Sequence, residues 1–332
     1  MIATAGTVFA LAGLVSIGAA ALLVSRLERL GARLGLTEAL LGLLAALAAD
    51  GPEITAATTA LLRGQRSVGV GVVVGSNVFN LAALLGLGAL VAGRIRLHRD
   101  VVLLEGTVAC WLAGITVLVA TGAAGPGTGL ALALPVLVAY VIVAALPPTA
   151  RDRLPLPGRW RRWLSTAVAD EERELAPQRP TPTTGRRDGA VAGLALVTVV
   201  GASVVMEHVA VTIGAHYAIA GVIIGGVVLA AVTSLPNAVA AIYLARRGRG
   251  TATLSTALNS NSLNVVFGLL APAVLVGLGI PSGGSTLIAV CYLGLTGFVL
   301  VACYAGRGLG RRAGAAIVAG YVAFVAVLLA GA

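Results

Sequence analysis

Long runs of apolar residues alternate with short polar segments along almost the whole chain. A helix needs about 20 apolar residues to cross the hydrocarbon core of a bilayer. The pattern therefore predicts an all-α polytopic membrane protein with ten transmembrane helices. The predicted spans are residues 3–24, 37–62, 68–92, 101–121, 127–147, 189–212, 219–245, 253–278, 284–305 and 313–331.

One hydrophilic segment, residues 148–188, interrupts this alternation between the fifth and sixth spans. It is rich in proline and charge, and it divides the chain into two five-span halves, residues 1–147 and 189–332. We predict a partly disordered cytosolic linker with a short interfacial helix around Trp160 and Trp163.

Composition agrees with the membrane assignment, because 58% of the residues are hydrophobic and only 11% are charged. The first apolar run has no basic region before it and no cleavage site after it, so we expect a retained span. The three cysteines lie inside apolar runs, where packing is the expected role.

The net charge of +10 comes from 23 arginines and no lysine. All but two of the arginines lie in loops on the side of the linker, and the opposite side has only Arg63 and Arg66. By the positive-inside rule, the linker is predicted to be cytoplasmic and both termini outside a plasma membrane. Topology thus explains the basic balance, and no nucleic-acid partner is expected.

The two halves match each other when 184 is added to a position in the first half. The shift takes Pro52 to Pro236 and Arg63 to Arg247. It also takes Ser76, Asn77 and Asn80 to Ser260, Asn261 and Asn264. Since five spans per half is an odd number, the second copy must enter the membrane inverted. Inverted repeats are typical of alternating-access transporters, with the site at the repeat interface.

Four polar clusters stand at equivalent places: "ADGPE" (49–53), "GSNVFN" (75–80), "TSLPN" (233–237) and "NSNSLN" (259–264). Each proline removes a helical hydrogen bond, and unpaired backbone at membrane depth is tolerated where it lines a polar cavity. Carboxylates, amides, hydroxyls and carbonyls are hard oxygen donors that suit sodium or calcium. Asp50 and Glu53 lie near mid-membrane, where acids are functional by default.

These motifs resemble the sodium/calcium exchanger family of the cation/calcium antiporter superfamily. "GSNVFN" is a full match to the second motif of its repeat, and "TSLPN" matches the first except at its last residue. The resemblance implies two inverted five-helix repeats and ion-ligand positions in both, with backbone carbonyls of Ala46 and Ala230 contributing. Together with Asp50, the predicted ligands are Glu53, Ser76, Asn80, Thr233, Ser234, Asn237, Ser260 and Asn264.

The chain departs from the family pattern in its distribution of acids. Asn237 and Asn264 stand where the second repeat of the family has or often has an acid, and Asp50 adds one to the first repeat. The alternatives for the carboxylates are a structural pair satisfied by hydrogen bonds or snorkelling to an interface. For the serines and asparagines the alternative is helix packing. Glu105 and Glu207 are also intramembrane acids, for which an ion pair or a structural role is the alternative to a site role.

We therefore expect a secondary antiporter that exports Ca²⁺ in exchange for Na⁺ or H⁺, without a prosthetic group and without enzymatic activity. Two carboxylates are neutralised by one Ca²⁺, two Na⁺ or two H⁺, so a 2:1 electroneutral exchange is predicted. Inorganic cations and membrane lipids are the expected partners of a monomer. The alternatives are a monovalent cation/H⁺ antiporter, a passive cation channel or a binding-only sensor.

Overall fold

The computed structural model describes residues 2–175 and 185–330, which are almost entirely helical. Within this part of the chain, eight helices are long and apolar enough to cross a membrane. Two further helix pairs, each bent by 49° at a short break, raise the number to ten when each pair counts as one span. The ten predicted spans all correspond to these helices.

The first five spans are formed by α1, by α2 and α3, by α4 to α5, by α6 and by α7. Their elements are α1 (Ile2–Arg33), α2 (Glu38–Ala49), α3 (Gly51–Leu62), α4 (Arg66–Asn80), the π-helical segment η1 (Leu81–Leu87), α5 (Gly88–Ala92), β1 (Arg94–Arg96), α6 (Arg99–Ala120) and α7 (Pro126–Ala145).

The linker contributes α8 and α9, and the second half repeats the pattern of the first. These elements are α8 (Pro148–Arg151), α9 (Gly158–Leu175), α10 (Gly185–His216), α11 (Gly221–Ile223), η2 (Ile224–Leu229), α12 (Ala230–Thr233), α13 (Leu235–Arg246), α14 (Gly250–Leu263), η3 (Asn264–Leu270), α15 (Ala271–Val276), α16 (Gly283–Gly306), β2 (Gly308–Gly310) and α17 (Arg311–Ala330). The short strands β1 and β2 pair antiparallel.

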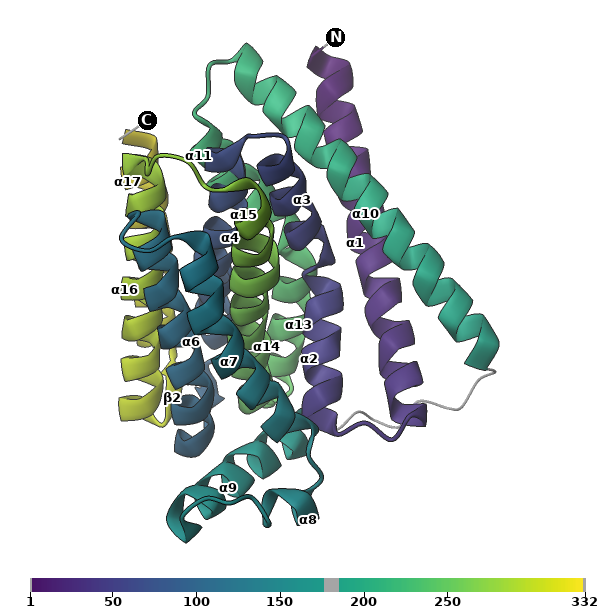
Figure 1. Ribbon diagram of the computed structural model, residues 1–332, viewed down its shortest axis with the longest axis vertical. Helices are drawn as coiled ribbons and strands as arrows, with labels where there is room; N and C mark the ends of the chain where they lie inside the picture. Colours follow the sequence, from purple (N-terminus) through teal and green to yellow (C-terminus); the bar gives the residue numbers. More distant parts are fainter. Residues whose placement is uncertain (1, 176–184, 331–332) are drawn as a thin grey trace.

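The third and eighth spans form the centre of the molecule. In the most apolar 18-residue window of each span, the buried share of residues is 94% for the span at 66–92 and 72% for the span at 250–276. The same share is 28% for α1 and for α10. In Figure 1, α1 and α10 cross each other at one side of the remaining helices. The polar motifs of both repeats therefore lie in the interior, away from the lipid-facing periphery.

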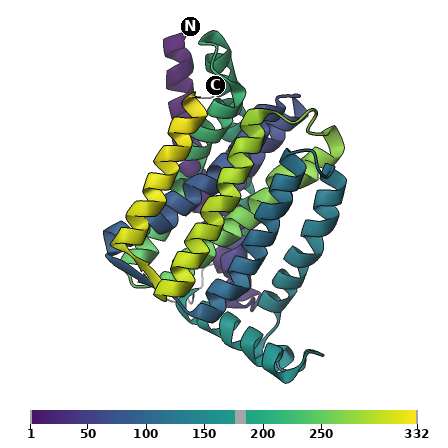
Figure 2. The ribbon, with the colours of Figure 1, turned by 90° about the vertical axis from the view of Figure 1, so that its left-hand side faces the viewer.

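The two halves share details of backbone geometry under the same shift of 184. After the break, α3 begins at Gly51 and α13 begins at Leu235. Gly64 and Gly248, which follow these helices, both have positive φ, at 77° and 74°. The segments η1 and η3 begin directly after or at Asn80 and Asn264. Figure 2 shows both termini at the end opposite α8 and α9. Two halves of five spans each require this, because an even total of spans returns the chain to the side on which it began.

The two repeats meet through glycines where α4 crosses η2. A Cβ atom on Gly75 would lie 2.3 Å from the carbonyl oxygen of Gly226, and one on Gly225 would lie 2.2 Å from that of Val68. Both distances are far inside van der Waals contact. Backbone therefore packs against backbone here, which brings the polar motifs on both sides of the crossing into reach of one another.

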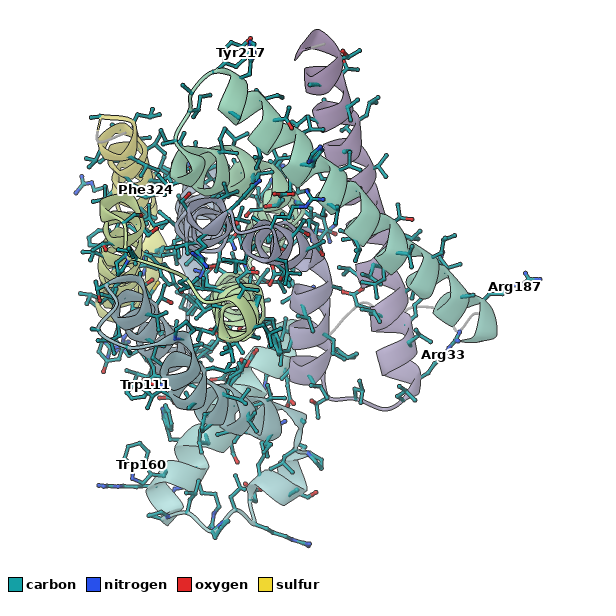
Figure 3. The ribbon with its side chains drawn as sticks, turned by 45° about the horizontal axis from the view of Figure 1, so that its top comes forward. Arg33, Trp111, Trp160, Arg187, Tyr217 and Phe324 are labelled. Carbon is teal, nitrogen blue, oxygen red and sulfur yellow. The ribbon has the colours of Figure 1, made fainter. Side chains whose placement is uncertain are left out.

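The linker forms an 18-residue helix, α9, which includes Trp160 and Trp163, the residues around which a short interfacial helix is predicted. Trp160 is exposed and labelled at the outer side of α9 in Figure 3, whereas Ala167 and Val168 are fully buried against the core. We predict partial disorder within the linker, residues 148–188, and its residues 176–184 lie outside the described part of the chain. The segment that is described covers one end of the helix bundle, which we call the linker end.

The helices α1 and α10 are tied together along their length. Ser16 and Ser203 share a hydrogen bond of 3.2 Å, and Asp188 pairs with Arg26 at 2.8 Å and with Arg33 at 3.2 Å. Figure 3 shows Arg33 and Arg187 at the same end of the two helices. These contacts make α1 and α10 one packed unit beside the core.

Candidate cation site

Two broken spans place the predicted carboxylates inside the molecule. Asp50 is the residue between α2 and α3, and Ser234 is the residue between α12 and α13. Pro52 and Pro236 lie in the first turn of the second helix of each pair, where a missing amide hydrogen costs little. The sequence-predicted breaks are confirmed at both prolines. Glu53 lies in the first turn of α3, where the helix dipole favours negative charge.

Asp50 is fully buried and is held by the second repeat. Its Oδ1 accepts hydrogen bonds from Ser260 Oγ at 2.5 Å and from Asn237 Nδ2 at 2.6 Å. Ser260 Oγ in turn accepts from Asn80 Nδ2 at 3.1 Å and from Asn237 Nδ2 at 3.2 Å. Asp50 is thus bonded directly by Asn237 of α13 and Ser260 of α14, and Ser260 links it to Asn80 of α4.

Glu53 is equally buried and is held in the same way. Its Oε1 accepts from Ser234 Oγ at 2.5 Å, and its Oε2 accepts from Asn264 Nδ2. Each carboxylate of the first repeat therefore receives one serine hydroxyl and one asparagine amide of the second repeat. None of these donors carries charge. No cationic side chain is therefore among the hydrogen-bond donors to the two carboxylates.

Asn77 and Asn261 lie at the centre of this network. Asn77 Nδ2 donates to the Asn261 carbonyl oxygen, and Asn261 Nδ2 donates to the Asn77 carbonyl oxygen, both at 3.1 Å. Because the two residues are counterparts under the shift of 184, this reciprocal pair marks the pseudo-two-fold axis. Asn80 Nδ2 also donates to Asn261 Oδ1 at 3.1 Å. We did not predict a site role for Asn77 or Asn261, although their presence among the matched positions was the available signal.

Several buried oxygens of the predicted ligands lack hydrogen-bond partners among residues 2–175 and 185–330. They are Asp50 Oδ2, Ser76 Oγ, Asn80 Oδ1 and Asn264 Oδ1. Buried polar atoms without partners are rare and need a reason, such as an ion. All four are oxygens, and all four belong to predicted ligands. Within the described chain, no three His, Cys, Asp or Glu side chains gather into a metal cluster, so a cation here would be held by mixed oxygen donors.

Not every predicted ligand joins the network. Thr233 is buried, but its Oγ1 donates to the carbonyls of its own helix, to Leu229 at 2.8 Å and to Ala230 at 3.3 Å. The Ala46 carbonyl accepts the Asp50 amide at 2.9 Å. Ser76 is buried one turn before Asn80 on α4, with its hydroxyl among the unpartnered oxygens. The structure therefore joins seven of the nine predicted side chains directly by hydrogen bonds.

The two other intramembrane acids lie outside this network. Glu207 on α10 pairs with Arg63 at the end of α3, with 2.7 Å between Oε2 and Nη1. This is the ion-pair role that we weighed against a site role. Glu105 on α6 accepts a hydrogen bond from Ser255 Oγ on α14, and its second neighbour is Glu171 of the linker helix. Glu171 was not predicted, because its acidic surroundings in sequence resemble a solvated helix face.

Inverted five-span repeats around a buried polar site define a membrane transporter of the secondary type. The chain matches the model of the sodium/calcium exchanger protein family over residues 4–147 and 189–330, that is, over both halves. The chain belongs to this family. The sequence-derived resemblance is thereby confirmed, and the family is one of exchangers and not of enzymes.

Known proteins resemble the chain in sequence and in fold. The chain is 29% identical over 269 residues to a putative antiporter, CaxA, from Alkalimonas amylolytica. The matched region covers 78% of this chain and 77% of that protein. The fold is similar to that of an H⁺/Ca²⁺ exchanger, CAX, with a TM-score of 0.73 at 13% identity over 98% of this chain and 86% of that one. It is also similar to the sodium-calcium exchanger NCX_Mj, with a TM-score of 0.63 at 17% identity over 98% and 99%.

Proposed function

We propose that this protein is a secondary-active antiporter that moves Ca²⁺, or a similar cation, across a membrane in exchange for Na⁺ or H⁺. The observation that carries the proposal is the pair of fully buried carboxylates, Asp50 and Glu53, whose hydrogen-bond donors are all neutral. Buried charge without a counter-ion is strongly unfavourable. Cations from the two solutions would supply the missing charge in turn.

The ligand set that we propose is the predicted one, with different weights. The two carboxylates and the unpartnered oxygens of Ser76, Asn80 and Asn264 would face the ion. Ser234, Asn237 and Ser260 would hold the carboxylates in place, because their donors are already used on them. Thr233 would shape the break in the seventh span through its bonds to its own helix.

The orientation and organisation of the chain are also proposals. The arginine asymmetry supports a cytoplasmic linker end and external termini in a plasma membrane. The packed pair α1 and α10 would move against the core to expose the site alternately. The two halves, 1–147 and 189–332, would then act as the inverted repeats of a single transport unit.

Charge counting sharpens the proposal. Two carboxylates balance one Ca²⁺, two Na⁺ or two H⁺, whereas a third Na⁺ would leave an unbalanced positive charge in a poorly solvated site. We therefore expect 2:1 electroneutral exchange. Because a proton neutralises a carboxylate as well as Na⁺ does, proton coupling is the second candidate.

The test is ⁴⁵Ca²⁺ flux in proteoliposomes under an imposed Na⁺ or pH gradient, at several clamped membrane potentials. One of the two gradients should drive uptake, and the rate should not change with potential. Asp50→Asn should abolish the flux, while Asp152→Asn, which changes an exposed carboxylate of the linker, should leave it unchanged. Flux without any exchanged ion on the other side would indicate a channel, and full activity of Asp50→Asn would refute the site.

A further inference from the structure

The linker helix α9 carries an acidic run, residues 170–174, and its acids contact different parts of the core. Asp170 Oδ2 lies 3.3 Å from His98 Nδ1, just before α6. Glu172 pairs with the buried Arg151. Glu174 Oε2 accepts the Thr251 amide at 2.6 Å and the Ala252 amide at 3.3 Å, at the first turn of α14. The acidic run is therefore a docking surface and not a solvated face.

Glu171 is the member of the run that points into the core. Glu171 is fully buried beside Glu105 of α6, and Glu105 is itself only 2% exposed. Within the described ranges, both Glu171 oxygens and Glu105 Oε2 lack a hydrogen bond of good geometry. Tyr140 of α7 and Ser255 of α14 lie close enough to interact with Glu171.

The charged groups around this pair are already paired elsewhere. Arg151 on α8 donates to Glu172 and to the Leu146 carbonyl oxygen. His98 faces Asp170. The residues of α14 and positions 39–49 of α2, which also pack against α9, include no titratable side chain. Tyr140 is neutral in its ordinary state.

Two buried carboxylates side by side without a positive neighbour cannot both be ionised at reasonable cost. A proton bound by one of them removes the repulsion and supplies a donor for the other. Burial raises the pKa of the Glu171 carboxyl from its ordinary value of 4.5 to about 7. The geometry therefore favours a Glu105–Glu171 pair that holds a proton while α9 is docked.

We propose that Glu105 and Glu171 form a proton-binding site, separate from the transport site, whose shared proton holds the linker helix α9 against the core. Release of α9 exposes the Glu171 carboxylate to water and discharges the proton. Since the docked state binds the proton more tightly than the released state, docking is strongest below the ordinary carboxyl pKa. It weakens as pH rises through the higher value of the docked state. The proposal does not depend on which ions the antiporter exchanges.

The experiment measures how accessible Ala167 is, because this residue of α9 is fully buried when the helix is docked. Ala167→Cys and Thr166→Cys are made separately in a background without the three native cysteines, and each protein is reconstituted in nanodiscs. Thr166 is exposed, so its maleimide labelling rate corrects for the pH dependence of thiol chemistry. The ratio of the two rates reports the release of α9. We expect this ratio to rise at least about five-fold between about pH 5.5 and about pH 8.5.

Two further variants make the result specific. Glu171→Gln replaces the carboxyl by a neutral amide of similar shape, and it should keep the ratio low at both pH values. His98→Gln removes the histidine that faces Asp170, and the rise in the ratio should persist. A ratio that does not change with pH, a rise that survives in Glu171→Gln, or a rise that disappears in His98→Gln would each overturn the proposal. So would closure of α9 by Na⁺ or Ca²⁺ at alkaline pH, since a metal cation would then replace the proton.

Discussion

The two repeats share their backbone geometry but divide the chemistry of the site between them. In the first repeat, the broken span supplies Asp50 and Glu53, which only accept hydrogen bonds when ionised. In the second repeat, the equivalent positions hold Ser234 and Asn237, which donate to those carboxylates. At the two broken spans, the first repeat thus supplies the acceptors and the second repeat supplies the donors. The difference places all the formal charge of the site on one side of the pseudo-two-fold axis.

The largest effect is expected from removing charge on the acceptor side. Glu53→Gln should reduce Ca²⁺ flux by about 100-fold or more, equivalent to ~3 kcal/mol, because the cation loses half of its counter-charge. Ser234→Ala removes only one neutral hydrogen bond to the same carboxylate, and it should reduce flux by about 10-fold or less. Equal losses in the two variants would show that the charge itself is not what the cation needs.

A smaller and different effect is expected from adding charge on the donor side. Asn237 Nδ2 lies 2.6 Å from Asp50 Oδ1, so Asn237→Asp would set two carboxylates in contact. A third positive charge must then enter to balance them, and the exchange should become sensitive to membrane potential. Asn237→Ser, which adds no charge, should keep flux independent of potential. Potential-independent flux in Asn237→Asp would contradict the charge-counting argument.

The centre of the network should respond symmetrically. Asn77→Ala and Asn261→Ala each remove one of the two reciprocal side-chain hydrogen bonds and leave the partner's buried carbonyl with only its backbone donor. Each should lower the stability of the protein in detergent by about 1–3 kcal/mol, as measured by thermal unfolding. The double variant should cost about the sum of the two, because each substitution removes its own hydrogen bond and keeps the backbone carbonyl to which the other asparagine donates. A marked difference between the single variants would show that the pseudo-symmetry does not extend to energetics.

The smallest effect is expected at Arg63 and its counterpart Arg247, which follow α3 and α13 and have different partners. Arg63 pairs with the buried Glu207 of α10, whereas its counterpart Arg247 is exposed and lies over the ring of Tyr243. Because Arg63 is 41% exposed, solvent screens the pair, and Arg63→Gln should change the apparent Ca²⁺ affinity by about two- to five-fold. Arg247→Gln should leave the affinity unchanged. Flux titrations of both variants test whether the contact between α3 and α10 biases transport.

Much of this arrangement could be predicted from local chemistry and the repeat. Pro52 and Pro236 marked the broken spans, since proline cannot continue a helical hydrogen-bond ladder. The shift of 184 identified the inverted halves and five of the residues in the network. The proline breaks depend on neighbouring residues, and the repeat is visible within a single chain. Both could therefore be predicted from this one sequence.

Other features depend on contacts that no local pattern encodes. The Thr233 hydroxyl bonds its own helix, as buried threonines in helices often do, and spacing alone could not separate this from ligation. The partner of Glu207 comes from another span, and the counterpart of Glu207 under the shift is Leu23. Glu171 looked solvated because acidic residues surround it, and only the docked position of α9 reveals its buried face.

The glycine crossing between Gly75 and Gly226 bears on how such sites diversify. The spacing between the repeats is set there by main chain against main chain, so exchanges at the neighbouring asparagines need not alter it. Asparagine and aspartate codons differ by a single nucleotide. A lineage can therefore gain or lose an acid at positions such as Asn237 and Asn264 in one mutational step, with the scaffold preserved. Ion preference in this architecture is free to drift quickly while its shape is held nearly constant.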